Sequence, residues 1–414
     1  MLGLIDLQSM YTSVEVAFDP RLRGKPVVVL GNGESVIVAR SPEAKALGLP
    51  MGAPIFEWRD LIDHAGVVVR SSNYPLYGDM SERVYSILRE AVPDLQVDSI
   101  DECFLPMAKV RDPVGLAHEL MNRISRGVGL PCRVGLGPNR LFAKLANRLA
   151  KKRGGVVDLN PVREREQVLE TTPVADLWGI ASRWSQRLNA LGIDNALQLR
   201  DAPPALLRKR FGVVMARIQG ELSGYNCIQV NDVEPDRRQI FVTRGFGQAI
   251  TELSAMREAI AVYVERAAEK MRARGLRANA LHVFMHTSPF RSDAQYSASA
   301  TGPLPVPTGD TRTLLRLARA LTDRMWRSGY RFAKGGVGLL DLSRVDRTQG
   351  DLFAGETERQ GRAMDVVDRI NGKFGRGTVR FAAQGATPVR AWSQRQAHLS
   401  PAYTTRWSDI IVAR

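Results

Sequence analysis

Cysteine is scarce in this chain of 414 residues, which contains only Cys103, Cys132 and Cys227. Their number is odd, and no two of them lie close together in the sequence. This argues against a disulfide framework and against a zinc ribbon. Unpaired thiols are typical of proteins in a reducing compartment, so we expect a cytoplasmic protein.

Long apolar runs are also missing, and no stretch has the length needed to cross a membrane. The first residues lack the basic start, apolar core and cleavage site of a secretory signal, so we expect no such signal. The sequence contains no internal repeat and no low-complexity segment. With 24% charged and 44% hydrophobic residues, it fits a globular protein of several domains.

Acidic residues are outnumbered by basic ones. There are 43 Asp and Glu against 58 Lys and Arg, which gives a formal net charge of +15. A protein this basic most often binds a polyanion such as a nucleic acid. A ribosome-bound protein or one on a lipid surface has a similar balance, so charge alone does not choose among these classes.

Two adjacent acids, Asp101 and Glu102, interrupt an otherwise apolar stretch from Val97 to Leu105. The apolar part predicts a short buried strand, in which bare charges are costly. A divalent metal is the simplest positive partner, and the alternative is a turn with two solvated acids. Neighbouring side chains on a strand point to opposite faces, so a shared site requires the strand to begin or bend at these acids.

A third acid, Asp6, follows the apolar residues of a strand predicted to begin at Leu2. Ser9 can begin a helix, because apolar residues follow it at helical spacing. An acid at a strand end beside a helix N-terminus suits a cation and a phosphate, since the free amides of Met10 and Tyr11 face an anion. The alternative is that Asp6 only caps the turn.

Basic residues lie on ordered elements near these acids. One group belongs to a small mixed region, residues 25–70, in which two strands are expected to pair as a hairpin. Another shares one face of a helix predicted to begin at Asn139. Such cations can bind phosphate groups, and the alternative is an ordinary solvated surface. The residues are Arg40, Lys45, Lys144, Arg148 and Lys151.

The second half of the chain predicts two further domains. Residues 174–230 are expected to be helical, and the turns at Gly179 and Gly192 resemble a helix-hairpin-helix, which binds nucleic-acid phosphates through backbone amides. Residues 239–342 predict the order βαββαβ, a small sheet with two helices on one face. One more helix is expected near residues 357–371.

Three acids from two strand ends, with cations nearby, suit one chemistry in particular. Two divalent cations held by such acids can activate an attacking hydroxyl and stabilise a leaving oxygen. Phosphoryl transfer needs mostly this positioning and charge neutralisation. The sequence therefore predicts nucleotidyl transfer on a nucleic acid.

Three segments carry a resemblance to a known family. Residues 6–15 (DLQSMYTSVE), 72–81 (SNYPLYGDMS) and 99–102 (SIDE) resemble motifs of the Y-family translesion DNA polymerases. Further matches along nearly the whole chain are similar to the UmuC type, which includes the catalytic subunit of bacterial DNA polymerase V and plasmid-borne relatives. The resemblance implies error-prone, template-directed DNA synthesis across lesions in the SOS response. The alternatives are a catalytically silent polymerase-like scaffold, which could lose the three acids, and a nucleotide cyclase on a related fold.

The resemblance implies an α+β multidomain fold, the right-hand polymerase. Its parts would be a palm with a mixed sheet, small fingers, a helical thumb, a βαββαβ little finger and a UmuC-type tail. In this sequence they would be residues 1–24 and 71–165 (palm), 25–70 (fingers), 166–235 (thumb), 236–345 (little finger) and 346–414 (tail).

The resemblance also assigns the site. Asp6, Asp101 and Glu102 would be catalytic and hold two Mg²⁺ ions, with the Leu7 carbonyl assisting. Tyr11 falls at the steric gate, where an aromatic ring excludes a ribose 2′-hydroxyl. The remaining nucleotide-binding positions would be Met10, which stands where an aromatic residue is usual, and Arg40, Lys45 and Lys151.

The partners implied by the resemblance are primer-template DNA, a deoxynucleoside triphosphate, a dimer of processed UmuD type, a RecA filament and a sliding clamp, with no membrane. Residues 349–353 resemble a clamp-binding peptide, with Gly350 in place of a usual leucine. The clamp-binding residues would be Gln349, Asp351, Leu352 and Phe353.

Overall fold

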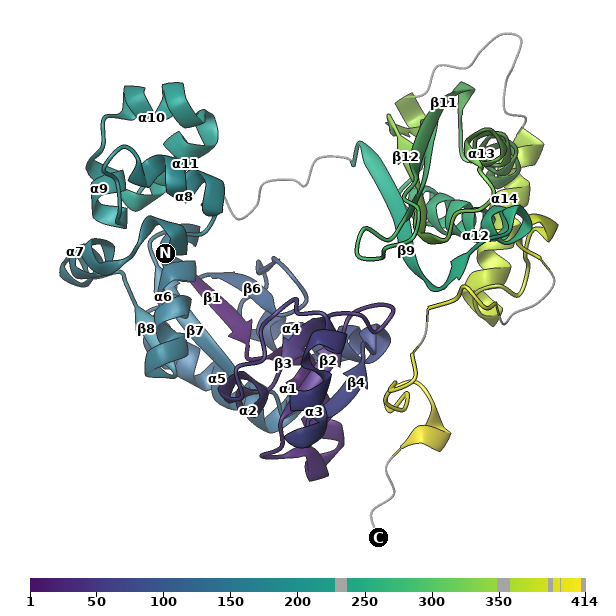
Figure 1. The fold of residues 1–414 in the computed structure, drawn as a ribbon. Helices are drawn as coiled ribbons and strands as arrows, with labels where there is room; N and C mark the ends of the chain where they lie inside the picture. Colours follow the sequence, from purple (N-terminus) through teal and green to yellow (C-terminus); the bar gives the residue numbers. More distant parts are fainter. Residues whose placement is uncertain (228–236, 348–357, 386–389, 395, 411–414) are drawn as a thin grey trace. The chain divides into compact units, whose positions relative to one another are not determined.

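A computed structural model describes residues 1–227, 237–347, 358–385, 390–394 and 396–410 of the chain. They form two compact units, which Figure 1 shows coloured along the sequence. The N-terminal unit comprises Met1–Gly31, Val36–Val233 and His398–Arg414, and the C-terminal unit comprises Asn32–Ser35 and Glu234–Ala397. The segment that starts at His398 therefore belongs to the same unit as the first residues of the chain.

The N-terminal unit is built around a five-stranded sheet in the order β5-β6-β1-β7-β8 (Figure 1). Strand β1 (Leu2–Leu7) is buried along its whole length. It pairs antiparallel with both β6 (Glu102–Pro106) and β7 (Cys132–Gly137). Short strands complete the two edges of the sheet, and they are β5 (Gln96–Val97) and β8 (Val156–Asp158).

Helices cover both faces of this sheet. Ile5 and Leu7 of β1 pack into a core with α1 (Met10–Phe18), α4 (Tyr74–Ala91) and α5 (Pro113–Val128). Leu2 and Leu4 point to the opposite face, where they pack with Ala143 of α6 (Arg140–Arg153). The alternation along β1 thus places Asp6 on the α6 face of the sheet, with Leu2 and Leu4.

Two glycines allow α6 to approach β7 closely. A Cβ atom on Gly135 would lie 2.2 Å from the backbone nitrogen of Asn147, and one on Gly137 would lie 2.7 Å from that of Ala143. The side-chain amide of Asn147 donates to the Leu4 carbonyl at 3.2 Å, which ties the helix to β1. The basic residues of α6 are thereby held near the strands that carry the acids.

A smaller sheet in the order β3-β2-β4 packs beside α1. Strands β2 (Val27–Leu30) and β3 (Ile37–Arg40) pair antiparallel, which confirms the predicted hairpin. Strand β4 (Val68–Ser71) runs parallel to β2. The helices of this region are α2 (Pro42–Ala46), α3 (Arg59–His64) and the short 3₁₀ turns η1 (Pro20–Leu22) and η2 (Ile55–Trp58).

A cluster of short helices follows in the same unit and has its own apolar core, to which α6 contributes Leu141 and Phe142. Gly192 has a φ of +75° in the turn between α8 and α9, the left-handed conformation that a glycine adopts without strain. The region predicted to be helical, residues 174–230, is largely helical over its described part, and the helix-hairpin-helix within it stays a prediction. The elements are α7 (Val162–Thr171), η3 (Val174–Asp176), α8 (Ser182–Asn189), α9 (Ala196–Asp201), α10 (Pro204–Phe211) and α11 (Val213–Leu222).

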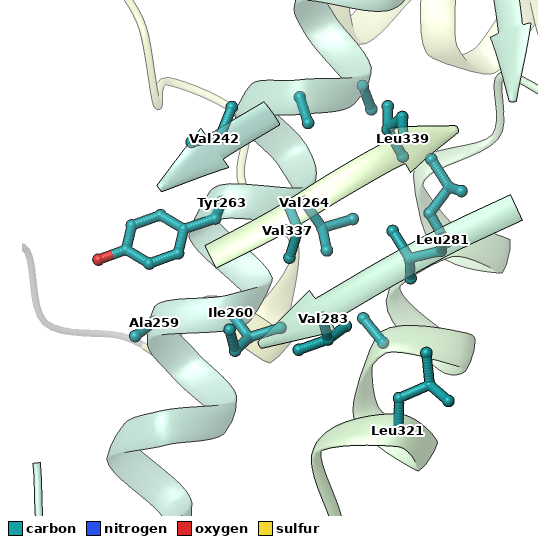
Figure 2. Packing of buried hydrophobic residues seen from close by; sticks show 14 of the residues in the cluster. Val242, Ala259, Ile260, Tyr263, Val264, Leu281, Val283, Leu321, Val337 and Leu339 are labelled. Atoms are coloured by element: carbon teal, nitrogen blue, oxygen red, sulfur yellow. The ribbon is translucent and has the colours of Figure 1, made fainter. Parts of the chain in front are cut away.

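The C-terminal unit contains the predicted βαββαβ order. Its antiparallel sheet has the order β11-β10-β12-β9, and β13 pairs with β10. Both helices of the motif pack on one face, where Ile260, Val264 and Leu321 meet Val283 and Val337 of the sheet (Figure 2). The elements are β9 (Gln239–Ile250), α12 (Leu253–Arg272), β10 (Leu276–Thr287), β11 (Ser297–Thr308), α13 (Thr311–Met325), β12 (Phe332–Leu340) and β13 (Ser343–Arg344).

Beyond this sheet the chain forms η4 (Val345–Arg347), α14 (Glu358–Phe374), η5 (Ala382–Gln384) and η6 (Trp407–Asp409). Helix α14 matches the helix predicted near residues 357–371, and Asp368 on it forms an ion pair with Arg272 of α12 at 2.7 Å. Among the described residues, no helix has the length and apolar character to cross a membrane.

Candidate active site

Asp6 of β1 and Glu102 of β6 are direct partners in the antiparallel register. Opposed residues on neighbouring strands project from the same face of a sheet, so both carboxylates lie on the α6 face. Strand β6 begins at Glu102, and the amide of Leu7 donates to the Asp101 carbonyl at 2.9 Å just before it. A shared site for Asp101 and Glu102 requires the strand to begin or bend at these acids, and β6 does begin at Glu102.

Each of the two opposed acids is paired with a cation. The Arg133 guanidinium donates to Oδ1 of Asp6 from Nη2 at 2.7 Å and from Nε at 3.0 Å. The Lys144 ammonium donates to Oε2 of Glu102 at 2.6 Å and to Asp98 at 2.9 Å. Lys151 lies further along α6, with its Nζ 4.0 Å from Oδ2 of Asp6.

Burial raises the pKa of Glu102 above its ordinary value, and Lys144 opposes that rise while the charges of Asp6 and Asp101 add to it. Asp6 and Asp101 therefore both act electrostatically on Glu102. Asp101 is held by Ser99, whose hydroxyl donates to Asp101 Oδ1 at 2.6 Å. Across the described part of the chain, no three His, Cys, Asp or Glu side chains lie together as a group that could hold a metal ion. The two opposed acids are each paired with a cation instead.

Lys45 reaches the start of α1. Its Nζ donates to the hydroxyl of Ser9 at 2.6 Å, and Ser9, the residue before the helix, has a φ of +46°. Burial lowers the pKa of Lys45, and the positive charges of Arg40, Arg133 and Lys151 lower it further. Three cations, Lys45, Arg133 and Lys151, thus interact with Asp6, more positive charge than that carboxylate neutralises. Arg40 itself donates to the carbonyl of Leu49.

Tyr11 lies in the first turn of α1 and belongs to a cluster of three aromatic rings. Its ring stacks on Tyr77 with a centroid distance of 4.4 Å and an interplanar angle of 14°. Tyr74 meets the Tyr11 ring edge-on at 5.8 Å. Burial raises the pKa of Tyr11, and the neighbouring Tyr74 and the charge of Asp101 add to the rise. The preceding Met10 is only 3% exposed and packs into the core.

A cleft of about 520 Å³ lies beside Glu102, between α6 and the segment Ala175–Trp178. The three α6 cations predicted to share a face all line it, which confirms that spacing argument. Arg148 pairs there with Asp176 at 2.6 Å, and the Lys144 ammonium lies 5.1 Å from the centre of the Trp178 ring. The cleft is lined by Glu102, Lys144, Arg148, Lys151, Lys152 and Trp178, among others.

The structure thus brings together Asp6, Glu102, Lys45 and Lys151 with Tyr11 nearby, while the predicted clamp-binding residues Gln349, Asp351, Leu352 and Phe353 lie outside the described residues. The sequence analysis did not identify Arg133, although the alternation of apolar residues along β7 indicates which face of the sheet its side chain occupies. Cys132, Val134 and Leu136 are buried on one face, so Arg133 must project from the other.

Comparison with known proteins identifies the family. Residues 5–148 match the model of the impB/mucB/samB family, and residues 237–352 match the C-terminal domain of that family. Protein UmuC of Salmonella typhimurium is 39% identical over 421 residues, which cover 99% of each chain. This chain belongs to the impB/mucB/samB family. It is a UmuC-like Y-family translesion DNA polymerase.

Further relatives and a solved structure are also similar to this chain. Protein ImpB of Salmonella typhimurium is 38% identical over the full length of both chains. DNA polymerase IV of Moorella thermoacetica is 32% identical over 90% of this UmuC-like chain and 93% of its own. Among solved structures, a Y-family DNA polymerase chimera of Dbh and Dpo4 matches with a TM-score of 0.67 and 22% identity, covering 83% of this chain and 99% of that one. This likeness shows the α+β fold of Y-family polymerases. Residues 362–413 match a domain of unknown function.

Proposed function

We propose that this UmuC-like polymerase carries out template-directed nucleotidyl transfer at the carboxylates of β1 and β6. In this proposal the five-stranded sheet and its helices are the palm, the small sheet of β2, β3 and β4 is the fingers, and the helices after α6 are the thumb. The C-terminal unit supplies the little finger and part of the tail. The single observation that carries the proposal is the direct opposition of Asp6 and Glu102, with Asp101 adjoining them.

The donor set fits divalent metal ions, which polymerases of this family use. Carboxylate and carbonyl oxygens are the ligands that Mg²⁺ prefers. Asp6, Asp101 and Glu102, with the Leu7 carbonyl, would hold two Mg²⁺ ions in our proposal. When bound, such ions lower the pKa of an attacking hydroxyl and stabilise a leaving oxygen. Arg133 forms an ion pair with Asp6, and the Lys144 charge opposes the rise that burial produces in the pKa of Glu102.

The cations around Asp6 would bind the triphosphate of the incoming nucleotide. Lys45 and Lys151 are both close to this acid, and the pKa of Lys45 is lowered by burial and by neighbouring positive charge. A cluster of like charges is unfavourable by itself and becomes favourable when an anion neutralises it. Arg40 joins this cluster, and the first amides of α1, at Met10 and Tyr11, add the partial positive charge of a helix N-terminus.

Tyr11 would select the sugar. Its ring is fixed by Tyr77 below it and Tyr74 at its edge, so it cannot easily move aside. A ring held in this way beside the nucleotide would clash with a ribose 2′-hydroxyl and admit a deoxyribose. Tyr11 is therefore the steric gate in our proposal.

The surrounding charge favours a nucleic-acid template. The net charge of +15 and the basic cleft along α6 would bind DNA mainly through its phosphates, so affinity should fall steeply with salt. We extend the proposal to lesion bypass in the bacterial SOS response, in the cytoplasm, with a processed UmuD-type dimer, a RecA filament and a sliding clamp as partners. The peptide proposed for the clamp, residues 349–353, lies outside the described residues.

The runner-up function, a catalytically silent scaffold at stalled forks, is less well supported. A scaffold has no need of opposed, charge-compensated acids, and this chain keeps all three. A polymerase and a scaffold would both bind DNA and partner proteins, so only an assay of DNA synthesis distinguishes the two functions.

The test is primer extension with Mg²⁺ on an intact and on an abasic template, with and without the proposed accessory proteins. We expect Asp101→Ala to reduce extension at least about 100-fold, since metal ions contribute several kcal/mol to such reactions. Binding of primer-template DNA, measured by fluorescence anisotropy, should remain largely intact. Extension by Asp101→Ala at the wild-type rate would remove the proposed active site.

A further inference from the structure

The segment that begins at His398 contacts β4, α1 and the start of α4 in the N-terminal unit. The amide of Ser71 donates to the His398 carbonyl at 3.0 Å, and the amide of His398 donates to the Ser71 hydroxyl at 3.0 Å. Further along the segment, the Tyr403 ring stacks on Phe18 of α1 with a centroid distance of 4.9 Å and an interplanar angle of 4°. Residues 398–403 are thus anchored at their first and last positions.

Between these two anchors, Ser400 enters the core of the unit and is only 7% exposed. Its hydroxyl donates to Oε1 of Glu15 at 3.0 Å and accepts from the side-chain amide of Asn73 at 3.0 Å. Glu15, on α1, is itself only 2% exposed. A buried carboxylate needs hydrogen-bond donors, and a residue from the far end of the chain provides one of them.

The same carboxylate oxygen anchors the ring on which Tyr11 rests. The Tyr77 hydroxyl donates to Oε1 of Glu15 at 2.6 Å, and the Tyr77 side chain is fully buried. The Tyr11 ring stacks on Tyr77 at 4.4 Å. A continuous chain of contacts therefore runs from Ser400 through Glu15 and Tyr77 to Tyr11.

A second route supports the same cluster. Asn73 caps helix α4, since its side-chain oxygen accepts from the Leu76 amide at 3.4 Å. Its side-chain nitrogen donates to the carbonyls of Ser400 and Pro401 at 3.2 and 3.3 Å. The first turn of α4 carries both Tyr74 and Tyr77, so the C-terminal segment also fixes the start of the helix that holds them.

We propose that Ser400 is a positioning residue for sugar selection: through Glu15 and Tyr77 it holds Tyr11 against the incoming nucleotide. This inference rests on the proposed role of Tyr11 as the steric gate. It gives residues 398–403, which lie in a region that matches the model of a domain of unknown function, a task in the polymerase reaction. Ser400 does not touch the nucleotide, and loss of its hydroxyl would loosen the gate without removing the ring.

The experiment compares kcat/KM for a ribonucleotide and for the matching deoxynucleotide in single-nucleotide primer extension by the full chain. Ser400→Ala should lower the discrimination between the sugars about threefold to tenfold, the range expected for one lost hydrogen bond. The change should come from faster ribonucleotide incorporation, with deoxynucleotide incorporation altered less than about twofold. Ser400→Thr, which keeps a hydroxyl, should restore wild-type discrimination.

Ser408→Ala is the matched control, because Ser408 lies on the same segment and is exposed, and its hydroxyl donates to the neighbouring Asp409 at 3.2 Å. It should discriminate as the wild type does. Tyr77→Phe keeps the stacked ring and removes its hydroxyl, so it should loosen discrimination in the same direction even if Ser400→Ala folds poorly.

Tyr11→Ala distinguishes a failure of the positioning role of Ser400 from a failure of the steric gate itself. If Tyr11→Ala accepts ribonucleotides while Ser400→Ala and Tyr77→Phe discriminate as the wild type does, the positioning role is wrong and the gate stands. If Tyr11→Ala itself discriminates normally, the gate is wrong and the positioning role falls with it. Ser400→Ala added to Tyr11→Ala should produce no further loss of discrimination.

Discussion

The carboxylates of Asp6 and Glu102 face each other across two antiparallel strands, and each is bound by a cation from a different element. Arg133 comes from the neighbouring strand β7, and Lys144 comes from the helix packed on the sheet. The sheet thus brings together four residues that are up to 138 positions apart in the sequence, from Asp6 to Lys144.

Tyr11→Ala should raise ribonucleotide incorporation. A ring that blocks the 2′-hydroxyl imposes an overpacking cost of about 1–3 kcal/mol, or roughly 5- to 150-fold in rate. The measurement is kcat/KM for a ribonucleotide relative to the matching deoxynucleotide. Tyr11→Phe keeps the ring and serves as the control. Unchanged sugar discrimination in Tyr11→Ala would exclude Tyr11 as the gate.

Lys45→Ala should weaken binding of the incoming nucleotide. One charge-assisted hydrogen bond to a phosphate contributes about 1.5–3 kcal/mol, so KM for the deoxynucleotide should rise about 10- to 100-fold with a smaller change in kcat. Lys109→Ala, which removes an exposed lysine from a turn of the same unit, is the control for net charge. Equal KM values for the two variants would show that Lys45 does not contact the triphosphate.

Gly135→Ala should destabilise the N-terminal unit, because the added methyl group would lie 2.2 Å from the backbone of α6. Overpacking of this kind costs about 1–3 kcal/mol in the free energy of unfolding. Gly78→Ala, in the interior of α4 with nothing within 4 Å of the new atom, is the control and should stabilise the protein by up to about 1 kcal/mol. Chemical denaturation measures both, and a Gly135→Ala variant as stable as the wild type would contradict the close packing of α6 on β7.

Much of this fold could be predicted from the sequence because local signals were strong. The alternation of hydrophobic residues and helix caps such as Asn139 indicated most of the elements, and the βαββαβ order was visible in their succession. Boundaries were less certain where a strand continues into polar residues. The sequence pattern predicts a strand over residues 239–246, whereas β9 runs to Ile250. It predicts another near residues 294–300, whereas β11 spans Ser297–Thr308.

The acids of the site could be predicted because charges in apolar stretches are unusual, and Lys144 was among the cations expected near them, but Arg133 was not. Arg133 is one arginine among many, and only the register of β1 with β7 places it opposite Asp6. The contact between Ser400 and Glu15 joins residues 385 positions apart through one hydrogen bond. Sequence periodicity cannot predict such a contact, because the contact depends on how the whole chain folds.

The most direct test of the account separates the metal-binding role of Glu102 from its ion pair with Lys144. Asp98 and Glu102 both accept a hydrogen bond from Lys144, and in our proposal only Glu102 belongs to the active site. Single-turnover incorporation of one deoxynucleotide with Mg²⁺ should fall at least about 100-fold in Glu102→Gln, the scale of losing one electrostatic group at a reaction centre. The same rate should change less than about threefold in Asp98→Asn, which removes only an exposed ion-pair partner. Equal rates for the two variants, or a wild-type rate in Glu102→Gln, would contradict the proposal that these opposed carboxylates perform the chemistry.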